Sequence, residues 1–269
     1  MTAPPYTKQN QPSSPLVGVS ILSFCYHPDT PKEVGVCLVN PNGRVQSTFT
    51  VSSRIFGKSI RTDELIDTIQ KSKNTKKVQI SATDVSKNEE FEGKKRIYQA
   101  IEKEKPDLIT ICSTCLRARE LYSIVENLAK CAPTPANSSK YTIIFAPSDA
   151  AIVYARSQVA KPEEIELSKQ LHAQGSKVSP SVLIAASTAR RVQNPLHELT
   201  RLCTRGKNHL VNIPLHPFQN KFIEEGKESG VIHEACELAC IKAVAISGVD
   251  VSQLHLPEHQ GALQFIPGF

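Results

Sequence analysis

The spacing of apolar residues divides the first part of the chain into strand and helix signals. Residues 17–26 form a nearly continuous apolar run, which is typical of a central strand buried on both faces. Two further runs, at 33–39 and 44–51, flank the turn sequence NPNG at 40–43, where a glycine permits a positive φ. Because these connections are short, the three strands are predicted to pair antiparallel.

Helices and strands alternate in the segment that follows. Residues 71–88 are polar and predict a loop, and Ser148 is predicted to cap the last helix of this part. Helices are predicted over residues 63–69, 89–105, 116–131 and 149–156, and strands over 108–112 and 141–145. This order is that of the RNase H fold. We therefore predict the α/β class, with an RNase H-like mixed sheet, flanking helices and a following α-helical region.

The apolar pattern changes after residue 160. A helix is predicted over 182–202, interrupted at Pro195, and another over 222–246. The C-terminal residues 256–269 carry several apolar side chains but also two prolines, so this segment is expected to fray. The predicted organisation is a disordered tail (1–16), an RNase H-like domain (17–160), a linker and helix (161–214) and a helical region (215–269).

Composition and charge narrow the classes of partner. The chain of 269 residues is 40% hydrophobic, enough for a sizeable core, and its net charge of +6 is spread thinly. The one dense basic cluster is Lys71, Lys73, Lys76 and Lys77. It is interpreted either as a solvated helix end or as a weak, sequence-insensitive phosphate contact for nucleic acid. No stretch approaches the ~18 apolar residues of a membrane span, so no membrane partner is expected.

Candidate catalytic carboxylates are missing from the expected positions. Nucleases of the RNase H fold cut phosphodiesters with two metal ions, which carboxylates on the first strand, the fourth strand and the last helix must hold. The first strand offers Ser23 and Cys25 there, and the fourth ends at Cys112. Only Asp149 lies where the last helix would supply a carboxylate, and Asp29 is a possible shifted ligand. We therefore predict that the chain is not an enzyme.

The eight cysteines allow two further interpretations. Cys112 and Cys115 form a C-x-x-C pair after a strand, and His233, Cys236 and Cys240 share one predicted helix face. Together they suggest a zinc site or a redox pair, but their spacing is irregular and they lie in different predicted domains. Most of the cysteines lie in apolar runs, where a thiol behaves as a small hydrophobe. We expect free thiols, no metal and no cofactor.

Three phrases in fixed order carry a family resemblance. They are ARRVQNPLHE at 189–198, LHPFQN at 215–220 and ISGVDV at 246–251. Together they resemble the eukaryotic Spt-six (suppressor of Ty) family of transcription elongation factors and histone chaperones, and more loosely its bacterial relative Tex. Upstream, GVSILSFCY at 18–26 and DAAIVY at 149–154 are similar to the family's YqgF domain, a RuvC-like member of the RNase H superfamily.

The resemblance implies a non-catalytic scaffold that acts in the nucleus with the RNA polymerase II elongation complex and histones. It also implies that the chain ends where the family's helix-hairpin-helix element begins. The signature positions are expected to be structural: Arg190, Arg191, Gln193, Pro195, His216, Pro217, Gln219, Gly248 and Asp250. Two alternatives stay open, a RuvC/YqgF-like nuclease and a Tex-like nucleic-acid-binding factor.

Overall fold

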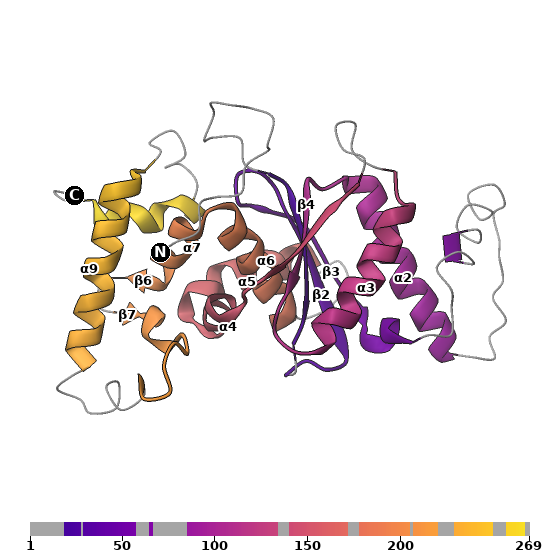
Figure 1. The fold of residues 1–269 in the computed structure, drawn as a ribbon, viewed down its shortest axis with the longest axis horizontal. Coiled ribbons are helices and arrows are strands. Elements are labelled where there is room, and N and C mark those ends of the chain that lie inside the picture. The colour runs from indigo at the N-terminus through magenta and orange to yellow at the C-terminus, as the bar shows by residue number, and fades with distance from the viewer. Residues whose placement is uncertain are drawn as a thin grey trace.

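A five-stranded mixed sheet forms the centre of the molecule (Figure 1). The structure is a computed structural model that describes residues 19–27, 29–57, 65–66, 85–133, 140–171, 178–204, 207–219, 229–249 and 257–266. The strands are β1 (Ile21–Tyr26), β2 (Glu33–Val39), β3 (Val45–Ser52), β4 (Leu108–Cys112) and β5 (Thr142–Ala146), in the order β3-β2-β1-β4-β5. β1, β2 and β3 pair antiparallel, whereas β4 and β5 run parallel to β1. The predicted fold class, an RNase H-like mixed sheet with flanking helices, is confirmed.

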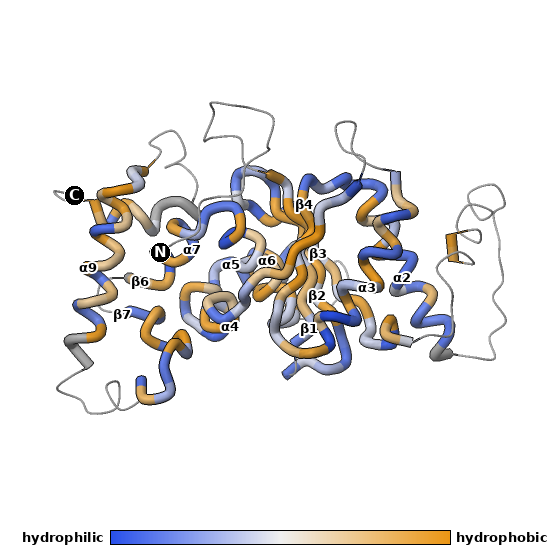
Figure 2. The backbone as a smooth tube through the Cα atoms, in the orientation of Figure 1, coloured by the Kyte–Doolittle hydropathy of each residue, from blue (hydrophilic) through white to orange (hydrophobic). Residues whose placement is uncertain are grey.

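Helices cover both faces of the sheet. α2 (Val85–Glu104) and α3 (Arg117–Cys131) lie on one face, and α4 (Asp149–Arg156), α5 (Lys161–Leu171) and α6 (Pro180–Gln193) lie on the other side (Figure 1). Successive strand residues point to opposite faces. Accordingly, Phe24 of β1 joins the core under α2 and α3, and its neighbour Cys25 joins the core under α6. This double burial explains the continuous apolar run of β1, which Figure 2 shows as hydrophobic strands at the centre of the molecule.

A smaller helical layer follows α6. It contains α7 (Pro195–Leu202), the short strands β6 (Cys203–Thr204) and β7 (Lys207–Asn208), and α9 (Ser229–Ser247). The 3-10 helices among the described residues are η1 (Ser53–Phe56), η2 (Gln158–Ala160), η4 (His209–Asn212) and η6 (Pro257–Phe265). As predicted, the helix around residue 194 is broken: α6 ends at Gln193, and Pro195 begins α7. None of the helices in the described part of the chain is long and apolar enough to cross a membrane.

Several predicted boundaries need correction. α2 begins at Val85, four residues before the predicted start, because the polar residues there lie on a helix and not in a loop. Ser148 occupies the N-cap position of α4, but its side chain makes no capping hydrogen bond. α5 was not predicted, because its buried apolar contribution is small: Leu167 is buried while Ile165 is exposed. Of the predicted helix over 63–69, the structure describes only 65–66.

The expectation that the C-terminal segment frays is wrong for the described residues of η6. Ala262 and Phe265 are 0% and 3% exposed and pack in one cluster with Leu196, Cys203 and Val244. Pro257 begins η6, and a 3-10 helix can still place apolar side chains against α7 and α9. These two helices supply the neighbours that the sequence pattern did not reveal.

α6 packs directly on the central sheet, although the predicted domain boundary at 160 places it outside the sheet domain. Its small residues Ala185 and Ala189 share a core cluster with Ile21 of β1. The approach is closest at Gly35 of β2, where an added Cβ would lie 2.4 Å from the backbone carbon of Ser181. A glycine is therefore required at this strand position, and the boundary at 160 itself stays a prediction.

Candidate functional site

Small buried polar side chains occupy the positions where a nuclease of this fold needs carboxylates. Ser23 of β1 and Thr110 of β4 are register partners, and both are fully buried. Cys112, at the end of β4, donates a hydrogen bond of 3.3 Å to Oγ1 of Thr188 in α6. Metal ions that catalyse phosphodiester cleavage need both carboxylate ligands and access for the substrate. Helix α6 covers these strand positions. None of the three side chains there, Ser23, Thr110 and Cys112, is a carboxylate.

Two thiols under α6, those of Cys25 and Cys37, are held in their protonated form. A hydrogen bond with Cys112 and burial both raise the pKa of Cys25, and burial raises the pKa of Cys37. Since the thiolate is the nucleophile and the metal ligand, these cysteines are poor candidates for either role. All eight cysteines are free in the structure. Within the described residues, no group of three or more His, Cys, Asp or Glu side chains is placed to hold a metal ion.

The two candidate carboxylates outside the strands lie on the surface. Asp149 is exposed in the first turn of α4. Asp29, in the loop after β1, forms an ion pair with Arg156, with 2.5 Å between Oδ2 and Nη2 and both side chains more than 60% exposed. The carboxylate of Asp29 is therefore already paired with Arg156, the last residue of α4.

Arg190 is the centre of a buried ionic cluster that joins four helices. Its guanidinium donates to both carboxylate oxygens of Glu163 in α5, at 2.7 and 2.9 Å, and its Nε donates to Glu198 in α7 at 3.1 Å. Arg201 also donates to Glu198, at 3.2 Å, and the hydroxyl of Tyr154 in α4 donates to Glu163. Both guanidinium groups lie over the Tyr154 ring, about 5 Å from its centroid. The cluster ties α4, α5, α6 and α7 together.

The electrostatics of the cluster keep the Glu163 carboxylate ionised. Burial opposes the charge on Glu163, but the positive charge and hydrogen bonds of Arg190, with smaller contributions from Arg201 and Tyr154, lower its pKa to about 2. Burial raises the pKa of Tyr154, so its hydroxyl stays a hydrogen-bond donor. Arg190 is only 4% exposed, and a charge this deeply buried is tolerated because it is paired on both sides.

Stability should depend on pH through Glu163. Its folded pKa of about 2 lies below the unfolded value of about 4.3, so its stabilising contribution is present above pH 4.3 and is lost as the pH falls toward 2. The difference in unfolding free energy between the wild type and Glu163→Gln should therefore shrink by roughly 3 kcal/mol between pH 6 and pH 2. Urea denaturation of both proteins across this range measures it. A constant difference would contradict the assignment.

Other residues of the first signature phrase connect α6 to the sheet. The Nε2 of Gln193 donates to the backbone oxygens of Val19, just before β1, and of Asn40, just after β2, at 2.6 and 2.7 Å. Asn194 caps α7 by accepting the N–H of His197, and Pro195 takes the first helical position. The first phrase therefore spans the end of α6, the cap residue Asn194 and the start of α7.

Arg191 is the less buried of the two arginines. Its Nη1 donates to the backbone oxygen of Pro147, before α4, at 3.4 Å. Adjacent residues in one helix thus have different environments: Arg190 points into the ionic cluster, and Arg191 lies at the surface.

The second phrase forms a braced loop after η4. The side-chain oxygen of Gln219 accepts the N–H of Leu215 at 3.0 Å, and its nitrogen donates to the backbone oxygens of Val211 and Ile213. This single glutamine closes the loop from both sides.

The remaining signature positions also act on the backbone. His216 accepts the N–H of Phe218 on Nδ1 at 3.2 Å, and Pro217 lies between them. Gly248 has a φ of +72° and ends α9 by donating to the backbone oxygen of Val244. Asp250 of the third phrase lies outside the described residues, as do Lys71, Lys73, Lys76 and Lys77 of the predicted phosphate contact.

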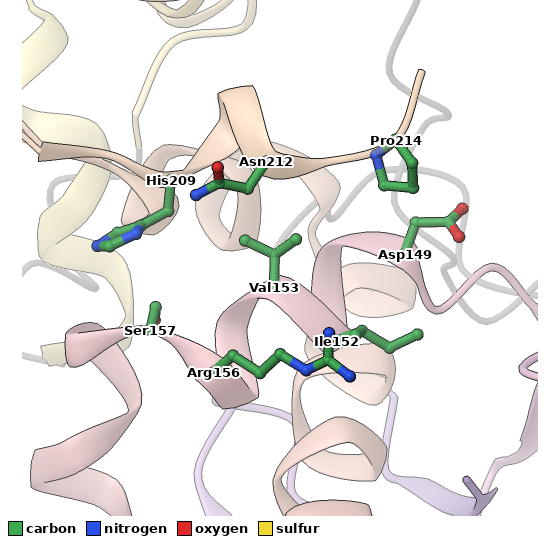
Figure 3. Close-up of a pocket in the computed structure, with 8 residues that line it drawn as sticks. All are labelled: Asp149, Ile152, Val153, Arg156, Ser157, His209, Asn212 and Pro214. Atoms are coloured by element: carbon green, nitrogen blue, oxygen red, sulfur yellow. The ribbon is translucent and has the colours of Figure 1, made fainter. Parts of the chain in front are cut away.

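A groove of about 340 Å³ lies between α4 and η4 (Figure 3). Ile152 and Val153 of α4 provide its apolar part. Figure 3 shows polar side chains around them, with Asp149 at one end of α4 and Arg156 at the other. The sequence named Asp149 as a possible metal ligand, whereas the structure makes it part of this groove.

Sequence reasoning missed the partners of Arg190. Glu198 stands inside the first phrase, eight residues from Arg190, and an ionisable residue within an apolar helix is a usable signal of a buried pair. Glu163 lies 27 residues before Arg190, and no local pattern connects the two. Only the packing of α5 against α6 brings them together.

Most described signature residues thus make contacts within the fold, in an ion pair, a cap, a helix end or a braced turn. In the structure, the first phrase lies where the sheet meets the helical layer, at the end of α6 and the start of α7. Comparison of the chain with known protein families and with curated proteins finds no match, so the function is argued from this geometry and from the resemblance of the three phrases.

Proposed function

We propose that the chain is a non-catalytic scaffold of a transcription elongation factor and histone chaperone of the Spt-six type. In this role it acts in the nucleus, with RNA polymerase II and histones as partners, and it catalyses no reaction itself. The three phrases support the family, and the RNase H-like fold agrees with the YqgF domain that the resemblance implies.

One observation carries the scaffold part of the proposal. The nuclease positions Ser23 and Cys112 are buried under α6, which approaches the sheet so closely that Gly35 has no room for a side chain. A helix packed this way blocks the approach of a phosphodiester. The same helix holds Arg190 and Gln193, the signature residues that bind it to its neighbours. A site filled by packed side chains favours a structural role over catalysis.

Chromatin immunoprecipitation tests the proposal in the cells that express the protein. The tagged protein should occupy transcribed regions together with RNA polymerase II and should leave them within minutes when elongation is inhibited. A matched variant, Arg190→Met, should lose occupancy in proportion to its loss of folded protein. Occupancy that is independent of transcription, or a cytoplasmic location, would overturn the proposal.

A nuclease assay separates the proposal from its enzymatic alternative. The purified chain is incubated with branched DNA, single-stranded DNA and RNA in magnesium or manganese, and no cleavage is expected. Cleavage abolished by Asp149→Asn but retained in Asp29→Asn would show that a metal site forms at α4, and the chain would then be an enzyme.

A further inference from the structure

Strand β5 forms one edge of the central sheet, and among the described residues no strand pairs with its outer side. The backbone N–H of Ser113, just after β4, donates to the backbone oxygen of Ala146 at 3.0 Å, so Ala146 faces β4. The backbone groups of successive residues point to alternate sides of a strand, so Ile144 also faces β4. The N–H and C=O groups of Ile143 and Phe145 therefore face outward, where they can bind an added strand.

The outer side of β5 has none of the usual protection of an edge strand. Natural proteins protect such edges with charged side chains, prolines or β-bulges. β5 reads TIIFA, and its register with β4 is regular. Phe145 is 46% exposed and stacks on Tyr122 of α3, with 5.0 Å between the ring centroids. An apolar edge of this kind is suited to pairing with a further strand.

The opposite edge of the same sheet, β3, is protected. Its sequence, VQSTFTVS, is mostly polar, and its register with β2 shifts between Leu38 and Val39. The Nη1 of Arg96 in α2 donates to the backbone oxygen of Thr50 at 3.3 Å and so occupies an edge acceptor. Devices that prevent strand pairing are thus present at β3 and missing from β5.

A second copy of β5 matches this edge in an antiparallel register. Two five-residue strands overlap over their whole length when the middle residue, Ile144, lies opposite itself. Ile143 of each copy then lies opposite Phe145 of the other. Because these are the residues with outward backbone groups, each of the two pairs can exchange two hydrogen bonds.

The side chains agree with this register. Ile143 would cover the exposed side of the Phe145 ring, and pairs of an aromatic and a β-branched residue stabilise neighbouring strands. The nearest charged residue in the sequence, Lys140, would lie opposite Ser148, so no like charges meet. The contact is self-complementary, as a two-fold dimer requires.

We propose that the chain forms a two-fold dimer in which β5 pairs antiparallel with β5 of a second copy. The two five-stranded sheets then form one continuous sheet. This inference goes beyond the proposed scaffold function, because none of the three signature phrases includes β5.

Sedimentation equilibrium of the purified chain tests the dimer. The wild type should show a monomer–dimer equilibrium that shifts toward dimer as concentration rises. Phe145→Lys should weaken it by at least about tenfold, because a charge on an edge strand opposes pairing. Phe218→Lys is the matched control, since Phe218 is 58% exposed in the loop after η4, and its dimer constant should equal that of the wild type. A monomeric wild type, or equal constants in the two variants, would overturn the proposal.

Disulfide cross-linking tests the register independently of the lysine variants. In a chain carrying Cys131→Ser, which removes the exposed thiol, Ile144→Cys should form a covalent dimer when treated with diamide. The two Cα atoms of this non-hydrogen-bonded pair would lie about 4.5 Å apart, within disulfide range. Thr142→Cys is the control, because its two copies would lie about 13 Å apart along the strands. No covalent dimer in Ile144→Cys, or equal yields in both variants, would contradict the pairing.

Discussion

Replacement of Arg190 by methionine should lower the free energy of unfolding by about 3–5 kcal/mol, because it leaves two buried carboxylates without their shared cation. Glu163 and Glu198 both bind this guanidinium, and their side chains are 16% and 1% exposed. Urea denaturation at pH 7 measures the loss. The matched control is Arg191→Met, which removes the same charge from a surface position and should change stability by less than about 1 kcal/mol.

A second substitution distinguishes an unpaired charge from a packing defect. If buried charge causes the loss, adding Glu163→Gln to Arg190→Met should recover part of the stability, because Glu163 loses its paired cation in the single variant whereas Glu198 keeps Arg201 at 3.2 Å. Similar losses in the Arg190 and Arg191 variants would show that the cluster is not the main tie between the helices. A further loss in the double variant would favour packing as the cause.

Gly35→Ala should separate α6 from the sheet. The added methyl carbon would lie 2.4 Å from the backbone carbon of Ser181 and 2.6 Å from the nitrogen of Val182, and backbone atoms cannot rotate away. Overpacking of this kind typically costs about 1–3 kcal/mol, and the shift of a whole helix places this case at or above the upper end. Unfolding curves should show the loss, and the thiols of Cys25 and Cys112 should react faster with an alkylating reagent.

Gly57→Ala is the control for this prediction. There the new methyl group meets the carboxylate of Glu90, a buried side chain that pairs with Lys94, so the strain falls on α2 and not on α6. This variant can lose stability too, but the alkylation rate of Cys25 and Cys112 should match the wild type. Unchanged thiol reactivity in Gly35→Ala would show that α6 tolerates the methyl group without leaving the sheet.

Local patterns predicted most of the strand and helix order. The two-sided burial of β1 follows from its continuous apolar run, and the break between α6 and α7 follows from Pro195, whose ring disfavours helix in the preceding residue. The helix α5 escaped prediction because Leu167 alone among its described residues is fully buried. The failure at η6 has a related cause, since the residues that bury Phe265 belong to helices distant along the chain.

The site was predicted only in part. Residues in the signature phrases were expected to be structural, which stays a prediction. The structure adds the partners of the described ones, which lie elsewhere in the chain. Glu163 and Tyr154 stand outside the phrases, and the carbonyls that bind Gln193 lie about 150 residues or more before it. A pattern of a few residues cannot encode which distant segment will pack against it.

The sequence by itself therefore determined the class of fold, the buried strands, the proline break and the missing carboxylates, because each depends on residues close together in the chain. Only the tertiary structure decided that α6 lies on the sheet, that Gly35 must lack a side chain, that Arg190 bridges two carboxylates and that α4 and η4 enclose a groove. These features depend on contacts between residues far apart in sequence. Such contacts form only when the apolar faces of separate elements are buried together.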